Sequence, residues 1–131
     1  MTPQSGSERR QRFVVEGRLL TDVGGSIGVP VLSTPSMIGM MEQNAARLAI
    51  EQLPDGYATV GFEVSVRHFA AAREGTECEA YAVLREVVED RKLRFEVEVV
   101  ALGDGEPRVI GKGTHERRVI DVAAHAQSAG H

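Results

Sequence analysis

The chain has 131 residues, with 15 basic and 19 acidic side chains and a formal net charge of -4. That length predicts one domain with an ordinary apolar core. The basic residues are scattered, whereas nucleic-acid binding normally needs a basic face to neutralise phosphates. No apolar run approaches the ~20 residues of a membrane span. We therefore expect neither a nucleic acid nor a membrane as a partner.

The single cysteine, Cys78, excludes an intramolecular disulfide and a cysteine-rich metal site. The four histidines have no short spacing of the kind that binds zinc, so we expect no metal. The polar residues 1–12 lack the apolar core of a signal peptide. Together with the lone cysteine, this indicates a cytoplasmic protein.

Pattern and turn residues divide the chain into flexible ends at 1–10 and 122–131 and one domain at 11–121. The first strand of the domain is expected over residues 11–21. The stretch 22–30 that follows is rich in glycine and must be a loop.

The segment 35–53 is the only convincing helix. Thr34 is an acceptable N-cap, and Pro35 occupies the first helical position, where its missing N–H costs nothing. On a helical wheel, Glu42 falls near the centre of an apolar arc, opposite a solvated arc that contains Asn44. The apolar arc comprises Ile38, Ala45, Ala46, Ala49 and Leu53, and the solvated arc also includes Gln43, Arg47 and Glu51.

Four long strands follow the helix, joined by turns as antiparallel hairpins. In the first of them, Val60, Phe62, Val64 and Val66 alternate onto one face. This order is the α+β arrangement of the hotdog fold, one long helix wrapped by an antiparallel sheet of about five strands. Because one helix covers little of so long a sheet, we expect a homodimer, which can pair further into a tetramer. The four strands are predicted at residues 57–70, 76–89, 92–102 and 108–121.

A carboxylate, an imidazole and a hydroxyl are expected at the helix–sheet interface. Glu42 lies where the helix should be apolar, so it is either satisfied by structural donors or takes part in chemistry. His68 continues the apolar row of its strand and is expected beside Glu42, a pairing typical of acid–base catalysis. Thr34 is either a plain N-cap or a hydroxyl that holds an oxyanion with the help of the helix N-terminus.

The last strand contains a histidine and two glycines that need an explanation. His115 is interpreted as a structural residue or a hydrogen-bond partner. Gly111 and Gly113 lie inside the strand, where glycine indicates a bulge or a close approach of the backbone.

Three sequence motifs resemble the fluoroacetyl-CoA thioesterase family. That family has a segment with a threonine and, eight residues on, a glutamate, and it is similar to STPSMIGMME at residues 33–42. Its strand ending in the catalytic histidine resembles VSVRHFAAA at residues 64–72. Its closing strand is similar to GKGTHERRVI at residues 111–120.

The resemblance implies that Thr34, Glu42 and His68 are catalytic, in a hotdog dimer whose active sites lie near the subunit interface. Coenzyme A is then part of the substrate, and we expect no retained cofactor. In the mechanism that we expect, Glu42 is the base or the nucleophile and His68 protonates the departing thiolate. The residues expected to bind substrate are Pro35, Gly61 and Arg117.

The sequence departs from the family in the loop before Thr34. The fluoroacetyl-CoA enzyme carries a longer lid with phenylalanine there, whereas residues 22–33 are short, glycine-rich and free of aromatics. We therefore expect an acyl-CoA thioesterase that acts on small acyl or aryl-acyl thioesters. Two alternatives remain open: a non-catalytic hotdog module that binds acyl-CoA as a sensor or assembly unit, and an enoyl thioester hydratase or dehydratase.

Overall fold

The computed structural model describes residues 2–103 and 105–129. Five long strands form one antiparallel sheet in the order β1-β5-β6-β7-β4, and two short strands, β2 and β3, form a separate pair. The elements are β1 (Glu8–Val14), a short 3-10 helix η1 (Gly17–Leu19), β2 (Leu20–Thr21), β3 (Val31–Leu32), α1 (Thr34–Ile50), β4 (Tyr57–His68), β5 (Glu77–Val88), β6 (Lys92–Ala101), β7 (Arg108–Asp121) and α2 (Val122–Ala129).

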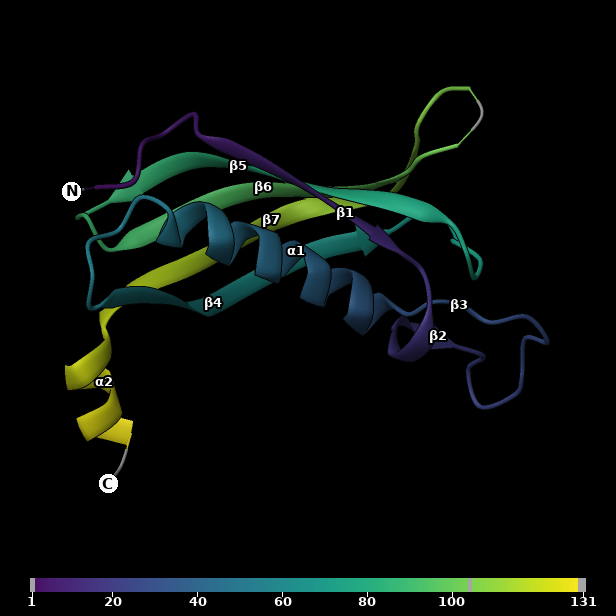
Figure 1. Ribbon diagram of the computed structural model, residues 1–131, viewed down its shortest axis with the longest axis horizontal. Helices are drawn as coiled ribbons and strands as arrows, with labels where there is room; N and C mark the ends of the chain where they lie inside the picture. Colours follow the sequence, from purple (N-terminus) through teal and green to yellow (C-terminus); the bar gives the residue numbers. More distant parts are fainter. Residues whose placement is uncertain (1, 104, 130–131) are drawn as a thin grey trace.

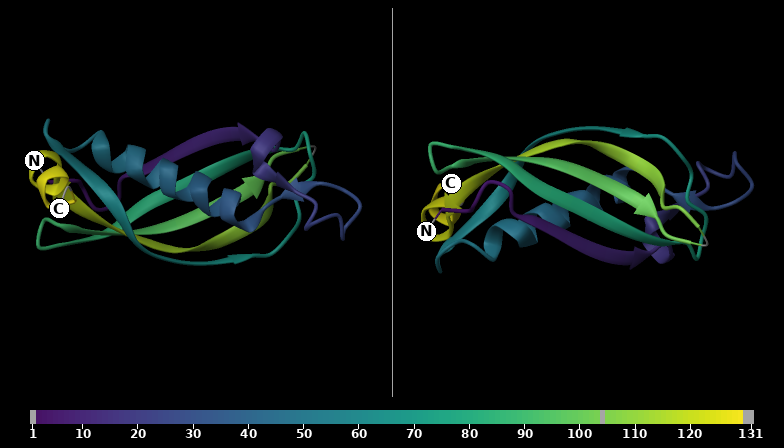
Figure 2. Two further views of the ribbon diagram at one scale, coloured as in Figure 1. Left: turned by 90° about the horizontal axis from the view of Figure 1, so that it is seen from below. Right: turned by 90° about the horizontal axis from the view of Figure 1, so that it is seen from above.

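Helix α1 lies across one face of the twisted sheet, and the strands curve around it (Figure 1). Seen from above, in the right-hand view of Figure 2, no helix or strand of the described residues covers the outer face of the sheet. This arrangement confirms the predicted α+β hotdog fold. No helix of the described part of the chain is long and apolar enough to cross a membrane.

The core lies between α1 and the inner face of the sheet. In β6 the predicted alternation is confirmed, because Leu93, Phe95, Val97 and Val99 are all buried. The facing positions of β5 hold small side chains, which let the helix approach closely. The helix and β5 contribute Met37, Met41, Ala45, Leu48, Ala49, Cys78, Ala80, Ala82 and Leu84.

The helix is rotated relative to the prediction, and Asn44 is fully buried where we expected a solvated arc. Its Nδ2 donates to the carbonyls of Arg9 (2.8 Å) and Ala80 (3.2 Å), and its Oδ1 accepts from Arg9 Nη1 (2.9 Å). A helical wheel considers one helix alone, so it cannot show that strands β1 and β5 supply hydrogen-bond partners to the buried Asn44 amide. The rotation places Glu42 on the flank of the buried face, with 40% of its side chain exposed.

Strand β4 contains a β-bulge at Phe62, and this corrects the predicted alternation. Gly61 pairs with Arg117 and Glu63 with Glu116, so Phe62 is an extra residue between them. The bulge reverses the in-and-out order of the strand. Phe62 is consequently 59% exposed and lies under the Arg118 guanidinium, 3.6 Å from the ring centroid.

Both ends of the chain contain more structure than the sequence indicated. Strand β1 begins at Glu8, and the residues before it bond to β5, with Gly6 N donating to Leu84 O (2.7 Å). The segment after β7 forms helix α2, whose start is marked by Asp121 Oδ1 accepting from Ala124 N (3.1 Å). An aspartate before an alanine-rich stretch is an N-cap signal that the sequence analysis missed. Residues 130–131 of the predicted tail lie outside the described residues.

Candidate active site

Thr34 lies in the first turn of α1 and is not its cap. Ser33 caps the helix instead, and its side chain accepts from Ser36 N (3.1 Å). The prediction that Thr34 is the N-cap is therefore wrong. The Thr34 hydroxyl instead forms a hydrogen bond with His68 Nδ1 (2.7 Å). Pro35 follows in the same turn and is exposed.

The Thr34–His68 pair lines an open pocket of about 340 Å³. His68 is the last residue of β4. After the bulge at Phe62, Val64, Val66 and His68 alternate onto the face of the strand that meets the helix. Its Nε2 is buried and has no hydrogen-bond partner among the residues that the structure describes. The remaining wall is largely apolar and includes Val23, Val31, Leu32, Phe69, Ala70 and Ala71.

Glu42 meets a different set of residues, on β4 and β7. Its Oε2 lies 3.9 Å from Arg117 Nη1, close enough for an ion pair. Gly61 faces the same carboxylate, and a Cβ at that position would lie 2.9 Å from Glu42 Oε2. A side chain at position 61 would displace the end of the Glu42 side chain, and the bulge at Phe62 brings Gly61 to this face.

Arg117 is buried, and its guanidinium is held on several sides. Nε donates to Thr59 Oγ1 (2.7 Å), Nη2 donates to the Thr59 carbonyl (3.0 Å), and Nη1 donates to His115 Nε2 (3.1 Å). Burial lowers the pKa of Arg117, and the nearby Glu42 carboxylate opposes that shift. His115 is thus a hydrogen-bond partner, one of the two roles left open for it. Thr59 was not foreseen, although it is a polar residue in an alternating strand.

The expected contact between Glu42 and His68 does not form within one chain. His68 is bonded to Thr34, whereas Glu42 lies against Gly61 and Arg117. Gly61 and His68 are seven residues apart on β4, which corresponds to roughly 20 Å along a strand. The chain thus presents two half-sites on the same face of β4, a hydroxyl–imidazole pair and a carboxylate with its guanidinium.

The two glycines of β7 confirm the expected close approach of the backbone. A Cβ on Gly111 would collide with the Met37 side chain, and one on Gly113 would collide with the Ser65 carbonyl. These glycines let β7 pack tightly against α1 and β4. No group of three or more histidine, cysteine, aspartate or glutamate side chains within the described ranges could hold a metal ion.

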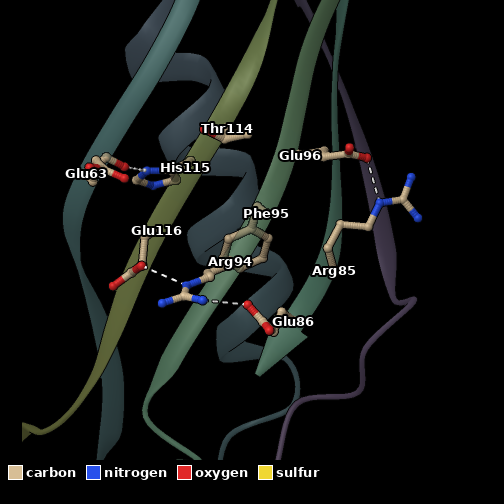
Figure 3. Close-up of a pocket in the computed structure, with 9 residues that line it drawn as sticks. All are labelled: Glu63, Arg85, Glu86, Arg94, Phe95, Glu96, Thr114, His115 and Glu116. Carbon is tan, nitrogen blue, oxygen red and sulfur yellow. Dashed lines mark hydrogen bonds and ion pairs between the residues drawn. The ribbon is translucent and has the colours of Figure 1, made fainter. Parts of the chain in front are cut away.

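Another pocket, of about 430 Å³, lies on the outer face of the sheet (Figure 3). Five of its charged residues form ion pairs with one another: Arg94 with Glu86 (2.6 Å) and Glu116 (3.1 Å), and Arg85 with Glu96 (2.6 Å). Exposed ion pairs of this kind contribute little stability individually. The pocket lies across the sheet from α1, and neither half-site opens into it.

The helix and its five-stranded antiparallel sheet define the class of the protein as a hotdog-fold protein. A hot-dog-like protein from Thermanaerovibrio acidaminovorans superposes with a TM-score of 0.82 at 21% identity, covering 95% of this chain and 89% of that chain. A thioesterase superfamily member from Thermus thermophilus superposes with a TM-score of 0.82 at 24% identity and the same coverage. At these identities the two structures support the fold.

The chain belongs to the family of fluoroacetyl-CoA-specific thioesterases, whose sequence profile matches residues 14–123. The fluoroacetyl-CoA thioesterase FlK superposes with a TM-score of 0.80 at 30% identity, covering 96% of this chain and 94% of that chain. A variant of FlK has been solved in complex with fluoroacetate and CoA. The comparison with curated proteins found no match. The protein is therefore an acyl-CoA thioesterase, the first of the three functions considered from the sequence.

Replacing Gly61 by alanine tests the carboxylate half-site. In Gly61→Ala the new methyl group, 2.9 Å from Glu42 Oε2, must displace the carboxylate. We expect kcat/KM for an acyl-CoA to fall by on the order of 10- to 100-fold, because small misplacements in a site are costly.

The matched control is Gly39→Ala on the exposed side of α1, where a Cβ meets nothing within 4 Å. It should keep full activity and stabilise the helix by about 0.5–1 kcal/mol. Unchanged kinetics in Gly61→Ala, with the fold intact by circular dichroism, would mean that the position of Glu42 is irrelevant to turnover.

Proposed function

We propose that this thioesterase hydrolyses small acyl or aryl-acyl thioesters of coenzyme A to the free acid and CoA, with Thr34, Glu42 and His68 as its catalytic residues. The observation that carries the proposal is the Thr34–His68 hydrogen bond of 2.7 Å at the N-terminus of α1. It joins a hydroxyl to an imidazole at the N-terminus of a helix, which favours developing negative charge. CoA enters as part of the substrate, as in the FlK complex with fluoroacetate and CoA.

In this mechanism the Thr34–His68 pair acts on the thioester carbonyl and the leaving group, and the Glu42–Arg117 pair acts on the attacking group. The Thr34 hydroxyl, at the positive end of α1, stabilises the oxyanion that forms when the thioester carbonyl is attacked. Glu42 either removes a proton from the attacking water or attacks the carbonyl itself to form an anhydride. The C–S bond then breaks, and His68 gives a proton to the departing thiolate. In the anhydride route water next hydrolyses the anhydride to the free acid, and in either route the proton lost by water returns to His68. Arg117 keeps a positive charge beside Glu42, and Gly61 and Pro35 border the space for substrate.

A homodimer would unite the half-sites. Strand β4 is at the edge of the sheet and pairs only with β7 in the described structure, so its other edge can pair with a second copy. Antiparallel pairing about a two-fold axis at Ser65, with the bulge residue Phe62 of each strand left out of the pairing, would set Gly61 opposite His68 of the partner subunit. Glu42 of one chain would then approach the histidine of the other, which fits an active site at the subunit interface.

The substrate range follows from the apolar pocket beside Thr34. The loop before Thr34 has no aromatic residue, but Phe69, directly after β4, lines the pocket and is 59% exposed. Val23 lines it from the loop and is 58% exposed. These open walls suit acyl or aryl groups of several sizes. We place the enzyme in the cytoplasm, where its one cysteine, buried and unpaired, is compatible with a reducing environment.

Replacing Glu42 by glutamine tests the catalytic assignment. We expect Glu42→Gln to remain folded and to lose about 10²- to 10⁴-fold in kcat, because it can neither take a proton nor attack. Thiol release from a panel of acyl-CoAs, followed with Ellman's reagent, measures this directly. Cys78 should not interfere at neutral pH, because burial raises the pKa of its thiol to about 11 despite the opposing effect of Arg108.

Glu51→Gln is the control for Glu42→Gln, since Glu51 follows α1 and forms an exposed ion pair with Arg9. It should leave the rate unchanged. Hydrolysis by Glu42→Gln at the wild-type rate would make Glu42 a structural residue and exclude the proposed mechanism.

Mixing two inactive variants tests whether the site spans two subunits. Glu42→Gln and His68→Ala should each be inactive, but a heterodimer of the two has one site with both residues intact. After unfolding and refolding together in equal amounts, about one quarter of the wild-type activity should return, as random pairing of subunits requires. Light scattering should give at least twice the 14.2 kDa chain mass. A monomer, or a mixture that stays inactive, would contradict the shared site.

The acyl preference is tested by comparing acetyl-CoA with fluoroacetyl-CoA. Without a tight lid, we expect the two kcat/KM values to differ by less than about 200-fold, the scale of discrimination that an apolar pocket achieves for one small group. Phe69→Ala should lower kcat/KM for an aryl-acyl-CoA more than for acetyl-CoA. A preference for fluoroacetyl-CoA of several orders of magnitude would mean that another element acts as the lid.

A further inference from the structure

Strand β7 turns two nitrogen-rich side chains toward α1, on the inner face of the sheet, where most of the buried residues are apolar. His115 is 2% exposed and Arg117 is 8% exposed, and being two residues apart they share the inner face. Burying a cation in such surroundings costs free energy unless each of its N–H groups has a hydrogen-bond acceptor. The mechanism proposed above gives Arg117 a place beside Glu42 but gives His115 no task.

The partners of His115 fix the position of its proton. A backbone carbonyl can only accept, so Nδ1, 2.8 Å from the Glu63 carbonyl, must carry the hydrogen (Figure 3). A guanidinium can only donate, so Nε2, 3.1 Å from Arg117 Nη1, must accept. The ring is therefore neutral and both of its nitrogens are bonded. Burial, more than any other factor, lowers the pKa of His115 and favours this neutral form.

The same contacts fix the plane of the Arg117 guanidinium. Two of its nitrogens bond to Thr59 on β4, and Nη1 bonds to His115. Bonds from all three nitrogens to fixed acceptors leave a planar group no freedom to turn. In this orientation Nη1 lies 3.9 Å from Glu42 Oε2, which allows charge attraction without a direct hydrogen bond. The His115 ring itself packs against Phe95, with centroids 6.2 Å apart.

We propose that His115 is a positioning residue of the thioesterase site: a neutral ring, protonated on Nδ1, that holds Arg117 so that Nη1 faces the Glu42 carboxylate without a direct hydrogen bond to it. The inference rests on the proposed role of Glu42 and adds a residue that supports it. Without an acceptor at Nε2, only the two bonds to Thr59 hold the guanidinium, and a tilt about them lets Nη1 bond Glu42 directly. That bond would occupy the carboxylate oxygen needed for attack or proton removal.

Two near-isosteric substitutions separate the two hydrogen bonds of the ring. His115→Gln can place an amide oxygen where Nε2 lies, so it can still accept from Arg117. His115→Asn can place an amide N–H near Nδ1, so it keeps the bond to the Glu63 carbonyl and loses the acceptor for Arg117. We expect kcat/KM to stay within about fivefold of wild type in His115→Gln and to fall on the order of 10- to 100-fold in His115→Asn.

The coupling to Arg117 is tested in a second background. In Arg117→Lys, His115→Asn should change kcat/KM by less than about threefold, because the group that it positions is gone. Equal losses in His115→Gln and His115→Asn, in step with their melting temperatures, would mean that the ring only fills space, and would overturn the proposal. So would a full effect of His115→Asn in the Arg117→Lys background.

A measurement that needs no substrate keeps the test independent of the catalytic assignment. Nitrogen-15 NMR of the histidine rings should show His115 protonated on Nδ1 alone at neutral pH. The Arg117 Nη1 hydrogens should exchange slowly in wild type and in His115→Gln, where an acceptor holds Nη1, and quickly in His115→Asn. A ring protonated on Nε2, or an Arg117 signal unchanged in His115→Asn, would overturn the proposal. If the signals behave as expected but no acyl-CoA releases thiol, the proposed function fails and the positioning of Arg117 stands.

Discussion

The β-bulge at Phe62 determines which residues of β4 meet the helix. Before it and after it the strand alternates normally, but the extra residue exchanges the two faces. Without it, Phe62 would point into the interface and Gly61 would point away. With it, the one residue that has no side chain lies opposite Glu42, and a carboxylate fits where the alternation predicts an aromatic ring. The aromatic ring is moved to the outer face, where the Arg118 guanidinium covers it.

The carboxylate in that space needs a counter-charge, and Arg117 supplies it from β7. Breaking a buried ion pair is costly because the remaining charge is left without a partner, whereas a pair whose other donors are satisfied can be tolerated. Here Thr59 and His115 accept three of the guanidinium hydrogens. In the proposed mechanism, the remaining attraction of the guanidinium acts on the Glu42 carboxylate. The hydrogen bonds that satisfy the buried guanidinium are therefore the same ones that orient it toward Glu42.

A similar link holds at the N-terminus of α1. A helix leaves its first N–H groups unpaired, and a capping side chain normally satisfies one of them. Because Ser33 does this, the adjacent Thr34 hydroxyl is free to bond His68. On the far flank of the helix, Asn44 fastens α1 to β1 and β5, and this sets the rotation of the helix. That rotation leaves Glu42 half-exposed, on the side where β4 presents an unpaired edge.

Periodicity and turn residues are enough to predict the long helix, the alternating strands and the hotdog arrangement, because they act over a few neighbouring positions. They also predict Thr34, Glu42 and His68 at one helix–sheet interface, of which the single chain brings together Thr34 and His68. The bulge at Phe62, the burial of Asn44 and the separation of Glu42 from His68 appear only in the folded chain. Each of these depends on which strand lies beside another and in what register, and such pairing between distant segments leaves no periodic signal in a single chain.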